Sequence, residues 1–256
     1  MNVLKLENVT MQFGGVIANN NINIEVEKGK IVALIGPNGA GKTTTFNVVT
    51  GVYQPTKGNI YFNNEKLNGL LPDKITKKGI ARTFQNIRLF SSLTVLDNIL
   101  IANHLHIKSN FLSSTVRTPW ARTEENNMRK KSEMLLDKLG LLHLKNEISS
   151  SLPYGEQRKL EIARALATDA TLLLLDEPAA GMNPHETEQL AKFIHTIRDE
   201  FDLTIFMIEH HMDLVMEISD KIYVLDFGQL IAQGTADEVK NNPRVIEAYL
   251  GVEEDA

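Results

Sequence analysis

The chain has 256 residues, 43% of them hydrophobic and 23% charged, which is typical of a globular protein long enough to bury a large core. Its 27 basic and 32 acidic residues give a net charge of −5, which disfavours nucleic acid as the principal partner. The sequence contains no cysteine, which excludes disulfides, Cys-based zinc sites and thiol catalysis.

The sequence also bears on membrane insertion. The first residues lack the basic segment and apolar region of a secretory signal. No apolar run approaches the roughly 18 residues that a membrane-spanning helix needs. We therefore expect a chain that does not cross a membrane by itself but can lie against one through a partner.

The N-terminal region predicts three strands. Alternating apolar residues predict half-buried, antiparallel strands over Val3–Thr10 and Asn21–Glu27. The turn expected between them, Met11–Gly15, carries Phe13, which is either a packed residue beside the turn or a platform on which a nucleotide base stacks. The apolar, β-branched-rich run Ile31–Ile35 predicts a buried strand.

A glycine-rich loop follows this buried strand and is the strongest functional signal. Its spacing matches the phosphate-binding pattern G-x-x-x-x-G-K-[ST]. Glycines let backbone N–H groups approach an anion closely, and the helix predicted over Lys42–Thr50 adds partial positive charge at its start. Lys42 can reach the β- and γ-phosphates, and the Thr43 hydroxyl can bind Mg²⁺. A surface turn can match this pattern by accident, but the strand before it and the helix after it favour nucleotide binding. The predicted ATP-binding residues of the loop are Gly36, Pro37, Asn38, Gly39, Ala40, Gly41, Lys42, Thr43 and Thr44.

The middle of the chain changes from mixed to helical character. A strand over Asn59–Phe62, a helix over Pro72–Gly79 and a strand over Ile80–Gln85 come first. From Ser91 to Ala167 the apolar residues follow helical spacing, which predicts a mainly helical insertion. Within it, the polar, turn-rich segment Ser109–Thr123 predicts an exposed loop.

The remaining chain alternates strands with helices. The predicted elements are strand Thr171–Asp176, helix Glu186–Glu200, strand Leu203–Glu209, helix Met212–Ile218, a hairpin of Lys221–Asp226 with Gln229–Gln233, and helix Asp237–Leu250. This alternation predicts an α/β fold with a parallel sheet, in which ligands bind at the carboxyl ends of the strands.

Three ionisable residues fall at such strand ends, together with the phosphate loop. Asp176 ends an apolar strand downstream of the loop, the position that supplies a Mg²⁺ ligand in P-loop NTPases. Glu177 is a candidate base for water, although an Asp-Glu pair at a strand end also suits a solvated turn. His210 follows the next strand and can hydrogen-bond a γ-phosphate, whereas a lone histidine is more often structural.

Five motifs occur in the order that characterises ATP-binding cassette (ABC) ATPases: the phosphate loop, Gln85, the turn and helix from Ser151, the Asp176-Glu177 pair and His210. The resemblance covers essentially the whole chain. It implies a P-loop NTPase core with an antiparallel β lobe, residues 1–90 and 168–256, and a helical subdomain, residues 91–167. It also implies that the chain hydrolyses ATP.

The resemblance assigns further roles. Phe13 corresponds to the aromatic residue that stacks on adenine, and Gln85 to the glutamine that contacts Mg²⁺ and the attacking water and couples the site to a transporter. The family's signature segment, which binds the γ-phosphate of ATP on the opposite subunit, corresponds to Leu152, Pro153, Tyr154, Gly155, Glu156 and Gln157.

Two motifs depart from the family pattern. The usual signature reads Leu-Ser-Gly-Gly-Gln, so the serine hydroxyl that meets the γ-phosphate is missing here. In the loop that communicates across the dimer, Asn183 replaces the usual aspartate. The composite site that uses this signature is therefore in question, while the residues for the chain's own ATP are complete.

The variant signature and three other segments resemble the LivG-type ATPases of branched-chain amino acid importers. The segments are Pro153–Arg158, Leu160–Leu166, Ile208–Met212 and Val245–Gly251. In that family two different ATPase subunits pair beneath two permease subunits at the cytoplasmic face of the membrane, and an extracytoplasmic binding protein delivers the substrate. A heterodimer gives the altered signature a rationale, because the partner can supply a regular one.

Three alternatives stay open. An ATPase of another ABC transporter, such as a lipopolysaccharide exporter, shares the core but has a signature closer to the usual one. A soluble ABC protein acting on DNA or ribosomes usually carries two cassettes or a long coiled-coil insertion, and this sequence has neither. A kinase or GTPase is a third class, but the guanine-reading N-K-x-D motif is missing from any suitable place.

Overall fold

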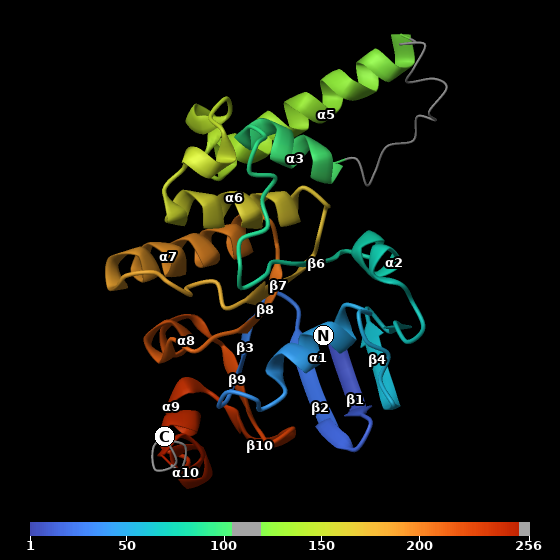
Figure 1. The fold of residues 1–256 in the computed structure, drawn as a ribbon, viewed down its shortest axis with the longest axis vertical. Coiled ribbons are helices and arrows are strands. Elements are labelled where there is room, and N and C mark those ends of the chain that lie inside the picture. Colours follow the sequence, from blue (N-terminus) through green and yellow to red (C-terminus); the bar gives the residue numbers. More distant parts are fainter. Residues whose placement is uncertain (104–118, 251–256) are drawn as a thin grey trace. The chain divides into compact units, whose positions relative to one another are not determined.

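The computed structural model describes residues 1–103 and 119–250. It consists of two compact units (Figure 1). The sheet unit comprises Met1–Gln85 and Thr171–Ala256, and the helical unit comprises Asn86–Ala170. The helical segment predicted over Ser91–Ala167 lies within the second unit.

The sheet unit contains an antiparallel sheet of four strands, in the order β2-β1-β4-β5. These strands are β1 (Asn2–Phe13), β2 (Val16–Glu27), β4 (Lys57–Phe62) and β5 (Glu65–Lys66). The antiparallel pairing of the first two strands is confirmed. The turn predicted over Met11–Gly15 is wrong for Met11 to Phe13, because β1 continues to pair with β2 until Phe13 meets Val16.

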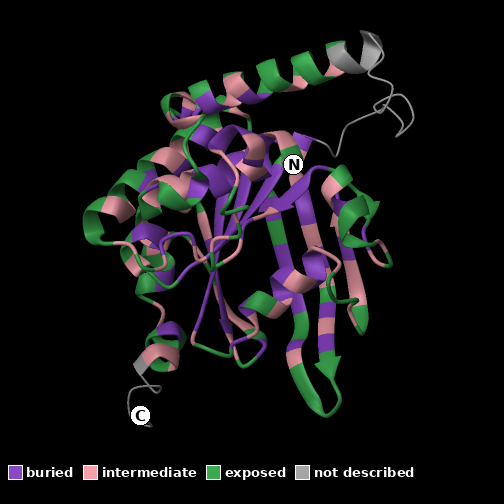
Figure 2. Ribbon diagram, turned by 45° about the horizontal axis from the view of Figure 1, so that its top comes forward, coloured by how far each residue is buried: buried purple, intermediate pink, exposed green. Residues whose placement is uncertain are grey.

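A second sheet has six strands, in the order β10-β9-β3-β8-β7-β6. These strands are β3 (Ile31–Ile35), β6 (Ile80–Arg82), β7 (Leu172–Asp176), β8 (Thr204–Ile208), β9 (Lys221–Asp226) and β10 (Gln229–Gly234). All neighbours are parallel except β9 and β10, which form the predicted antiparallel hairpin. Every residue of β3, β7 and β8 is buried, as expected for parallel strands covered on both faces (Figure 2). The predicted α/β fold with a parallel sheet is confirmed.

Helices complete the sheet unit, and Figure 1 shows α7 and α8 beside one face of the parallel sheet. The helices are α1 (Lys42–Val49), α2 (Pro72–Lys77), α7 (Pro184–Glu200), α8 (Met212–Ile218), α9 (Ala236–Lys240) and α10 (Pro243–Leu250). The single C-terminal helix predicted over Asp237–Leu250 is wrong. Pro243 cannot donate the hydrogen bond that a continuing helix requires, so α9 ends at Lys240 and a new helix begins at Pro243.

Helix α7 shows how the sequence sets an element's start. Asn183 is its N-cap and accepts a hydrogen bond from the Glu186 backbone, while the Glu186 side chain accepts one from the Asn183 backbone. Pro184 occupies the first helical position, where the missing N–H costs nothing. The helix therefore starts two residues before the predicted Glu186.

The described part of the helical unit contains α3 (Val95–Asn103), α5 (Pro119–Lys138) and α6 (Tyr154–Leu166), with the short 3₁₀ turns η2 (Leu142–Leu144) and η3 (Ser149–Ser151). The Asn103 amide donates to the Ser132 hydroxyl at 2.8 Å and joins α3 to α5. The loop predicted over Ser109–Thr123 is wrong from Pro119 onward, where proline starts a helix. Its first part, residues 109–118, lies outside the described residues.

One apolar cluster joins the two sheets of the sheet unit around α1. Phe46 of α1 and Phe206 of β8 are both fully buried, and their ring centroids are 5.1 Å apart. Such an aromatic contact adds to the hydrophobic effect of burying each ring. This cluster fixes the helix that follows the phosphate loop against the strands beside it.

We expect the Phe206→Ala variant to lose about 3–5 kcal/mol of unfolding free energy, because a large buried side chain is replaced by a cavity. Phe227→Ala is the matched control, since Phe227 is 86% exposed in the hairpin between β9 and β10. We expect that variant to stay within about 0.5 kcal/mol of the parent. Denaturant unfolding of the two variants measures the difference, and equal losses would contradict the core assignment.

Candidate functional site

The phosphate loop connects the carboxyl end of β3 to α1 in the predicted strand-loop-helix order. Two glycines are required by close backbone approach. Gly36 has φ +147° and Gly41 has φ +99°, and a Cβ at either position would collide with a backbone oxygen, of Leu225 or of Ala18. The loop is therefore built for glycine at these two positions, as expected where backbone N–H groups must face an anion.

Lys42 begins α1 and is almost completely buried. Its amine donates to the carbonyl oxygens of Gly36 at 2.6 Å and of Pro37 at 2.8 Å, so it lies folded over the loop that it follows. Burial lowers the pKa of the Lys42 amine, and the nearby Glu177 carboxylate opposes that shift. An anion in the loop would add a further charge partner for this amine.

Strands β7 and β8 place the catalytic candidates together. The parallel register pairs Asp176 with Ile208, so both strands end at the same edge of the sheet. Glu177 follows with φ +47°, a conformation that costs a non-glycine residue of the order of 1 kcal/mol and that clusters at functional sites. In that turn, Glu177 Oε1 lies 3.0 Å from His210 Nε2, and the Gln85 amide donates to Glu177 Oε2 at 2.6 Å.

Asp176 is held by a buried arginine. Arg82 donates from Nη2 to Asp176 Oδ2 at 2.6 Å, and both side chains are 7% exposed. A second nitrogen of Arg82 donates to the Asn47 side chain of α1 at 2.7 Å, and the guanidinium lies over the Phe46 ring.

β6 ends at Arg82, so the strand predicted through Gln85 is wrong beyond that residue, and Gln85 reaches Glu177 from a loop.

A cavity of about 210 Å³ lies over the phosphate loop. It is lined by residues 38–44, by Ala18, and by Glu177 and His210. Donors for phosphate and a candidate base for water thus face one space. This arrangement suits the binding of a phosphate chain and attack on its terminal group by water.

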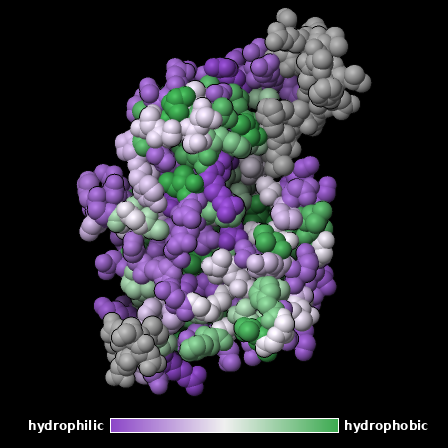
Figure 3. All heavy atoms as spheres, viewed as in Figure 1, coloured by the Kyte–Doolittle hydropathy of each residue, from purple (hydrophilic) through white to green (hydrophobic). Residues whose placement is uncertain are grey.

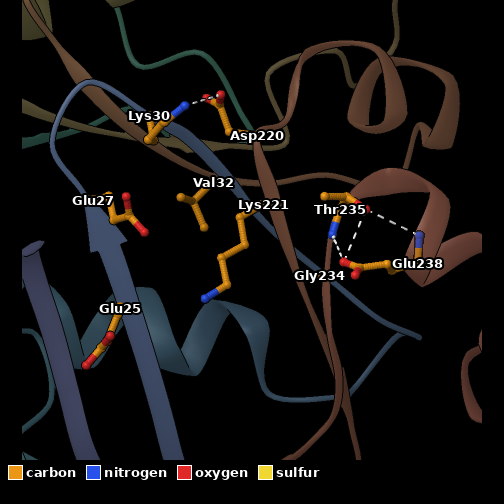
Figure 4. Close-up of a pocket in the computed structure, with 9 residues that line it drawn as sticks. All are labelled: Glu25, Glu27, Lys30, Val32, Asp220, Lys221, Gly234, Thr235 and Glu238. Carbon is orange, nitrogen blue, oxygen red and sulfur yellow. Dashed lines mark hydrogen bonds and ion pairs between the residues drawn. The ribbon is translucent and has the colours of Figure 1, made fainter.

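A second cavity, of about 280 Å³, lies at the opposite ends of β3 and β9, beside α9 (Figure 4). Three of its charged side chains bond within the protein: Lys30 with Asp220, and Glu238 with the Thr235 backbone. It has acidic residues from β2 and no glycine loop. The chemistry of the lining groups therefore assigns phosphate binding to the smaller cavity.

The donors near the phosphate loop fit Mg²⁺. This ion prefers oxygen ligands and usually combines one or two protein oxygens with substrate phosphates and water. The Thr43 hydroxyl lines the cavity, the Asp176 carboxylate ends β7, and the Gln85 amide lies beside Glu177. Mg²⁺ binding by Thr43, Asp176 and Gln85 stays a prediction.

Phe13 ends β1 and is not among the residues that line the cavity over the phosphate loop. Its ring is 42% exposed and meets the Tyr53 ring edge to face, with centroids 5.0 Å apart. An exposed ring held by a second aromatic side chain can offer a stacking face. Its contact with adenine stays a prediction.

The predicted signature residues begin α6 in the helical unit. Pro153 is the N-cap, Gln157 donates back to the Leu152 carbonyl at 2.8 Å, and Glu156 pairs with Lys159 at 2.9 Å. Beneath this turn, fully buried Arg158 bonds Glu161 at 2.8 Å and the Tyr154 hydroxyl at 3.2 Å. The first turn of α6 is thus braced internally, and its N–H groups form the type of helix start that binds anions.

Comparisons with known proteins agree with the order of these motifs. The family model described as "ABC transporter" matches residues 19–180, and the model described as "Branched-chain amino acid ATP-binding cassette transporter" matches residues 229–255. The chain is 46% identical to the high-affinity branched-chain amino acid transport ATP-binding protein BraF of Pseudomonas aeruginosa, covering 97% of this chain and 98% of that protein. The chain belongs to the ABC transporter family, as an ATP-binding protein of the LivG and BraF type.

The same family relation extends to other members and to solved structures. Identity to LivG of Escherichia coli K12 is also 46%, over 97% of this chain and 98% of LivG. An ABC transporter cassette solved in its ADP conformation superimposes with a TM-score of 0.86 at 33% identity, covering 98% of this chain and 99% of that chain. A nucleotide-free cassette gives 0.84 at 34% identity, with coverages of 97% and 99%. The predicted ABC ATPase fold is confirmed, whereas the roles of individual residues stay predictions.

Sequence reasoning missed several polar residues that support this ABC site. The sequence predicts Arg82 only as part of a strand and Glu209 only as the end of one. Asn19 is 1% exposed and donates to the Gly41 carbonyl and the Thr45 hydroxyl, each at 3.2 Å. The Tyr249 hydroxyl is buried near the Gly36 backbone, and burial raises its pKa to about 12. Each of these residues contacts a group that is distant in the sequence. None of them belongs to a local motif, so the sequence alone does not reveal them.

We expect Lys42→Ala to weaken ATP binding at least tenfold, since a charge-assisted bond to phosphate contributes about 1.5–3 kcal/mol. Lys66→Ala, which removes an exposed lysine of β5, is the charge-matched control and should leave the affinity unchanged. Titration of the full chain with ATP by calorimetry measures both. Equal affinities for the two variants would disprove the role of the phosphate loop lysine.

Proposed function

We propose that this chain binds and hydrolyses ATP to power the import of branched-chain amino acids through a membrane transporter. The chain is an ABC transporter ATPase by family. The observation that carries the catalytic assignment is the contact of Glu177 with both His210 and Gln85 beside the phosphate loop. The match of residues 229–255 to the branched-chain amino acid cassette model supports the substrate class and favours it over a lipopolysaccharide exporter.

Binding begins with the phosphate chain. Backbone N–H groups of the loop and the start of α1 surround the β- and γ-phosphates, and the Lys42 amine neutralises part of their charge. Phe13 stacks on the adenine ring. Mg²⁺, bound by Thr43, Asp176 and Gln85, would supply positive charge to the phosphate oxygens.

Hydrolysis uses the groups at the ends of β7 and β8. Glu177 accepts a proton from water as the water oxygen bonds to the γ-phosphorus, and the bond from that phosphorus to the bridging oxygen breaks to give ADP and phosphate. His210 and Gln85 hold the two carboxylate oxygens of Glu177, so the base is oriented before water attacks. His210 also hydrogen-bonds the γ-phosphate and responds to its presence.

Transport requires partners. In this proposal ATP clamps the chain to a second, different ATPase subunit whose regular signature completes the site over this phosphate loop. Both subunits lie beneath permease subunits at the cytoplasmic face of the cell membrane, and a binding protein outside the membrane selects the amino acid. Within the described residues no helix has the length and apolar character to span a bilayer.

Exposed apolar side chains of the helical unit support a protein partner. They are Phe90, Ile101, Met134, Ile148 and Tyr154. Figure 3 shows apolar side chains among polar ones on the visible face of this unit. Exposed apolar groups of this kind suit a surface that other subunits cover.

We expect Glu177→Gln to lower the rate of ATP hydrolysis by about 10²–10⁴-fold, because the amide cannot accept the proton from water. ATP binding should be retained, since the change removes no phosphate donor. Glu217→Gln alters the same functional group on the exposed face of α8 and serves as control. A Glu177→Gln variant that turns over near the parent rate would disprove the assignment of the base.

We expect affinity purification of the tagged chain from detergent-extracted membranes to recover permease subunits and a second ABC ATPase in equal amounts. Mass spectrometry of the purified complex measures the composition. Recovery of the chain without membrane subunits would contradict the transporter assignment, and recovery of a complex with this chain as its sole ATPase would contradict the heterodimer.

A further inference from the structure

Glu209 is a buried carboxylate that the proposed chemistry does not use. It directly follows β8 and is 1% exposed. It lies one residue before His210 along the chain. In the parallel register of β7 and β8 it also lies beside Glu177, because Asp176 pairs with Ile208.

Within the described part of the chain, the hydrogen bonds of this carboxylate are to backbone N–H groups of two turns. Glu209 Oε1 accepts from the Ala179 backbone at 2.7 Å, in the turn that follows Glu177. Glu209 Oε2 accepts from the His210 backbone at 2.7 Å and from the His211 backbone at 2.9 Å, in the turn before α8. One side chain therefore joins the turn that carries the candidate base to the turn that carries its histidine partner.

The chemistry of this contact requires a carboxylate. The Ala179 N–H group is buried and those of His210 and His211 are partly buried. Hydrogen bonds from such groups to a charged oxygen are about twice as strong as neutral ones. A glutamine of the same shape has one acceptor oxygen and one donor group, so it can satisfy one turn but not both. The left-handed conformation of Glu177 is a second reason for such a brace, since a strained turn persists only when its surroundings fix it.

We propose that Glu209 is a positioning residue that locks the Glu177 turn to the His210 turn and so sets the orientation of the base. This inference rests on the proposed roles of Glu177 and His210. Glu209 itself is not among the residues that line the cavity over the phosphate loop. Its loss should therefore reduce turnover while leaving the phosphate loop able to bind ATP.

The test compares Glu209→Gln and Glu209→Ala with the corresponding variants of Asp220, a second carboxylate that accepts a backbone N–H. Asp220 also accepts a backbone N–H, from Ile31 at 2.8 Å, together with the Lys30 amine at 2.9 Å, but it lies at the opposite edge of the same sheet. Asp220→Asn and Asp220→Ala therefore control for the loss of a structural carboxylate. The full chain in its co-purified complex is assayed for kcat, for KM and for thermal unfolding, and its amide hydrogen exchange is measured by mass spectrometry.

We expect kcat to fall about tenfold in Glu209→Gln and about 10²-fold in Glu209→Ala, because small displacements of a catalytic group have effects of this size. KM for ATP should change less than about threefold, since substrate binding uses other groups. Amide exchange should rise in the peptides spanning 177–183 and 209–213. The Asp220 variants should lower the unfolding temperature but keep kcat within about twofold of the parent, as expected for a change remote from the site.

Two results would overturn the proposal. The first is that kcat falls no further in the Glu209 variants than in Asp220 variants of equal stability. The second is unchanged exchange at 177–183, which would show that the two turns do not depend on Glu209. If Glu177 is not the base, the Glu177→Gln variant hydrolyses ATP at the parent rate. The exchange measurement still tests separately whether Glu209 joins the two turns. If Glu177 is the base and Glu209 positions it, adding Glu209→Ala to Glu177→Gln lowers kcat by a smaller factor than Glu209→Ala does alone.

Discussion

The register between β7 and β8 is the constraint on which the candidate site depends. Because Asp176 pairs with Ile208, the residues that follow both strands emerge at the same edge of the sheet. β3 lies on the other side of β8 and delivers the phosphate loop to that edge. A shift of one residue in either strand would turn every side chain to the opposite face and separate Glu177 from His210. The complete burial of both strands opposes such a shift.

Buried polar groups hold in place the side chains and turns that this register brings to one edge of the sheet. Arg82 fixes Asp176 and reaches α1 through Asn47, while Glu209 fixes the turns that follow β7 and β8. Each is a charged group taken out of water, which is costly unless bonds within the protein compensate. Both carboxylate oxygens of Glu209 and two nitrogens of Arg82 have such bonds, while Arg82 Nε has none within the described residues. Such groups are a poor way to gain stability. Their value here is that they leave one arrangement available to the residues around the phosphate loop.

Much of this site could be predicted because its chemistry is local in sequence. The residues of the phosphate loop have a fixed spacing. The apolar runs of β3, β7 and β8 predict parallel strands, and candidate functional residues follow the ends of these strands. The predictions failed where long-range contacts decide. Pairing with β2 extends β1 through Phe13, and Pro243 divides the last helix. Glu209 appeared as the polar end of a strand, because nothing in its neighbouring residues reveals the Ala179 backbone that it bonds.

The division into two units gives the altered signature a physical interpretation. The phosphate loop, Glu177, His210 and Gln85 all belong to the sheet unit, so their contacts with one another are complete within it. The signature belongs to the helical unit, where Tyr154 bonds the buried Arg158 and Glu161 completes the brace. If the signature serves another subunit's ATP as proposed, a change from serine to this tyrosine-containing turn would alter that service without disturbing the contacts around the chain's own phosphate loop. In the proposed heterodimer, whose partner supplies a regular signature, the two ATP sites would differ in strength, and the site over this phosphate loop would be the stronger of the two.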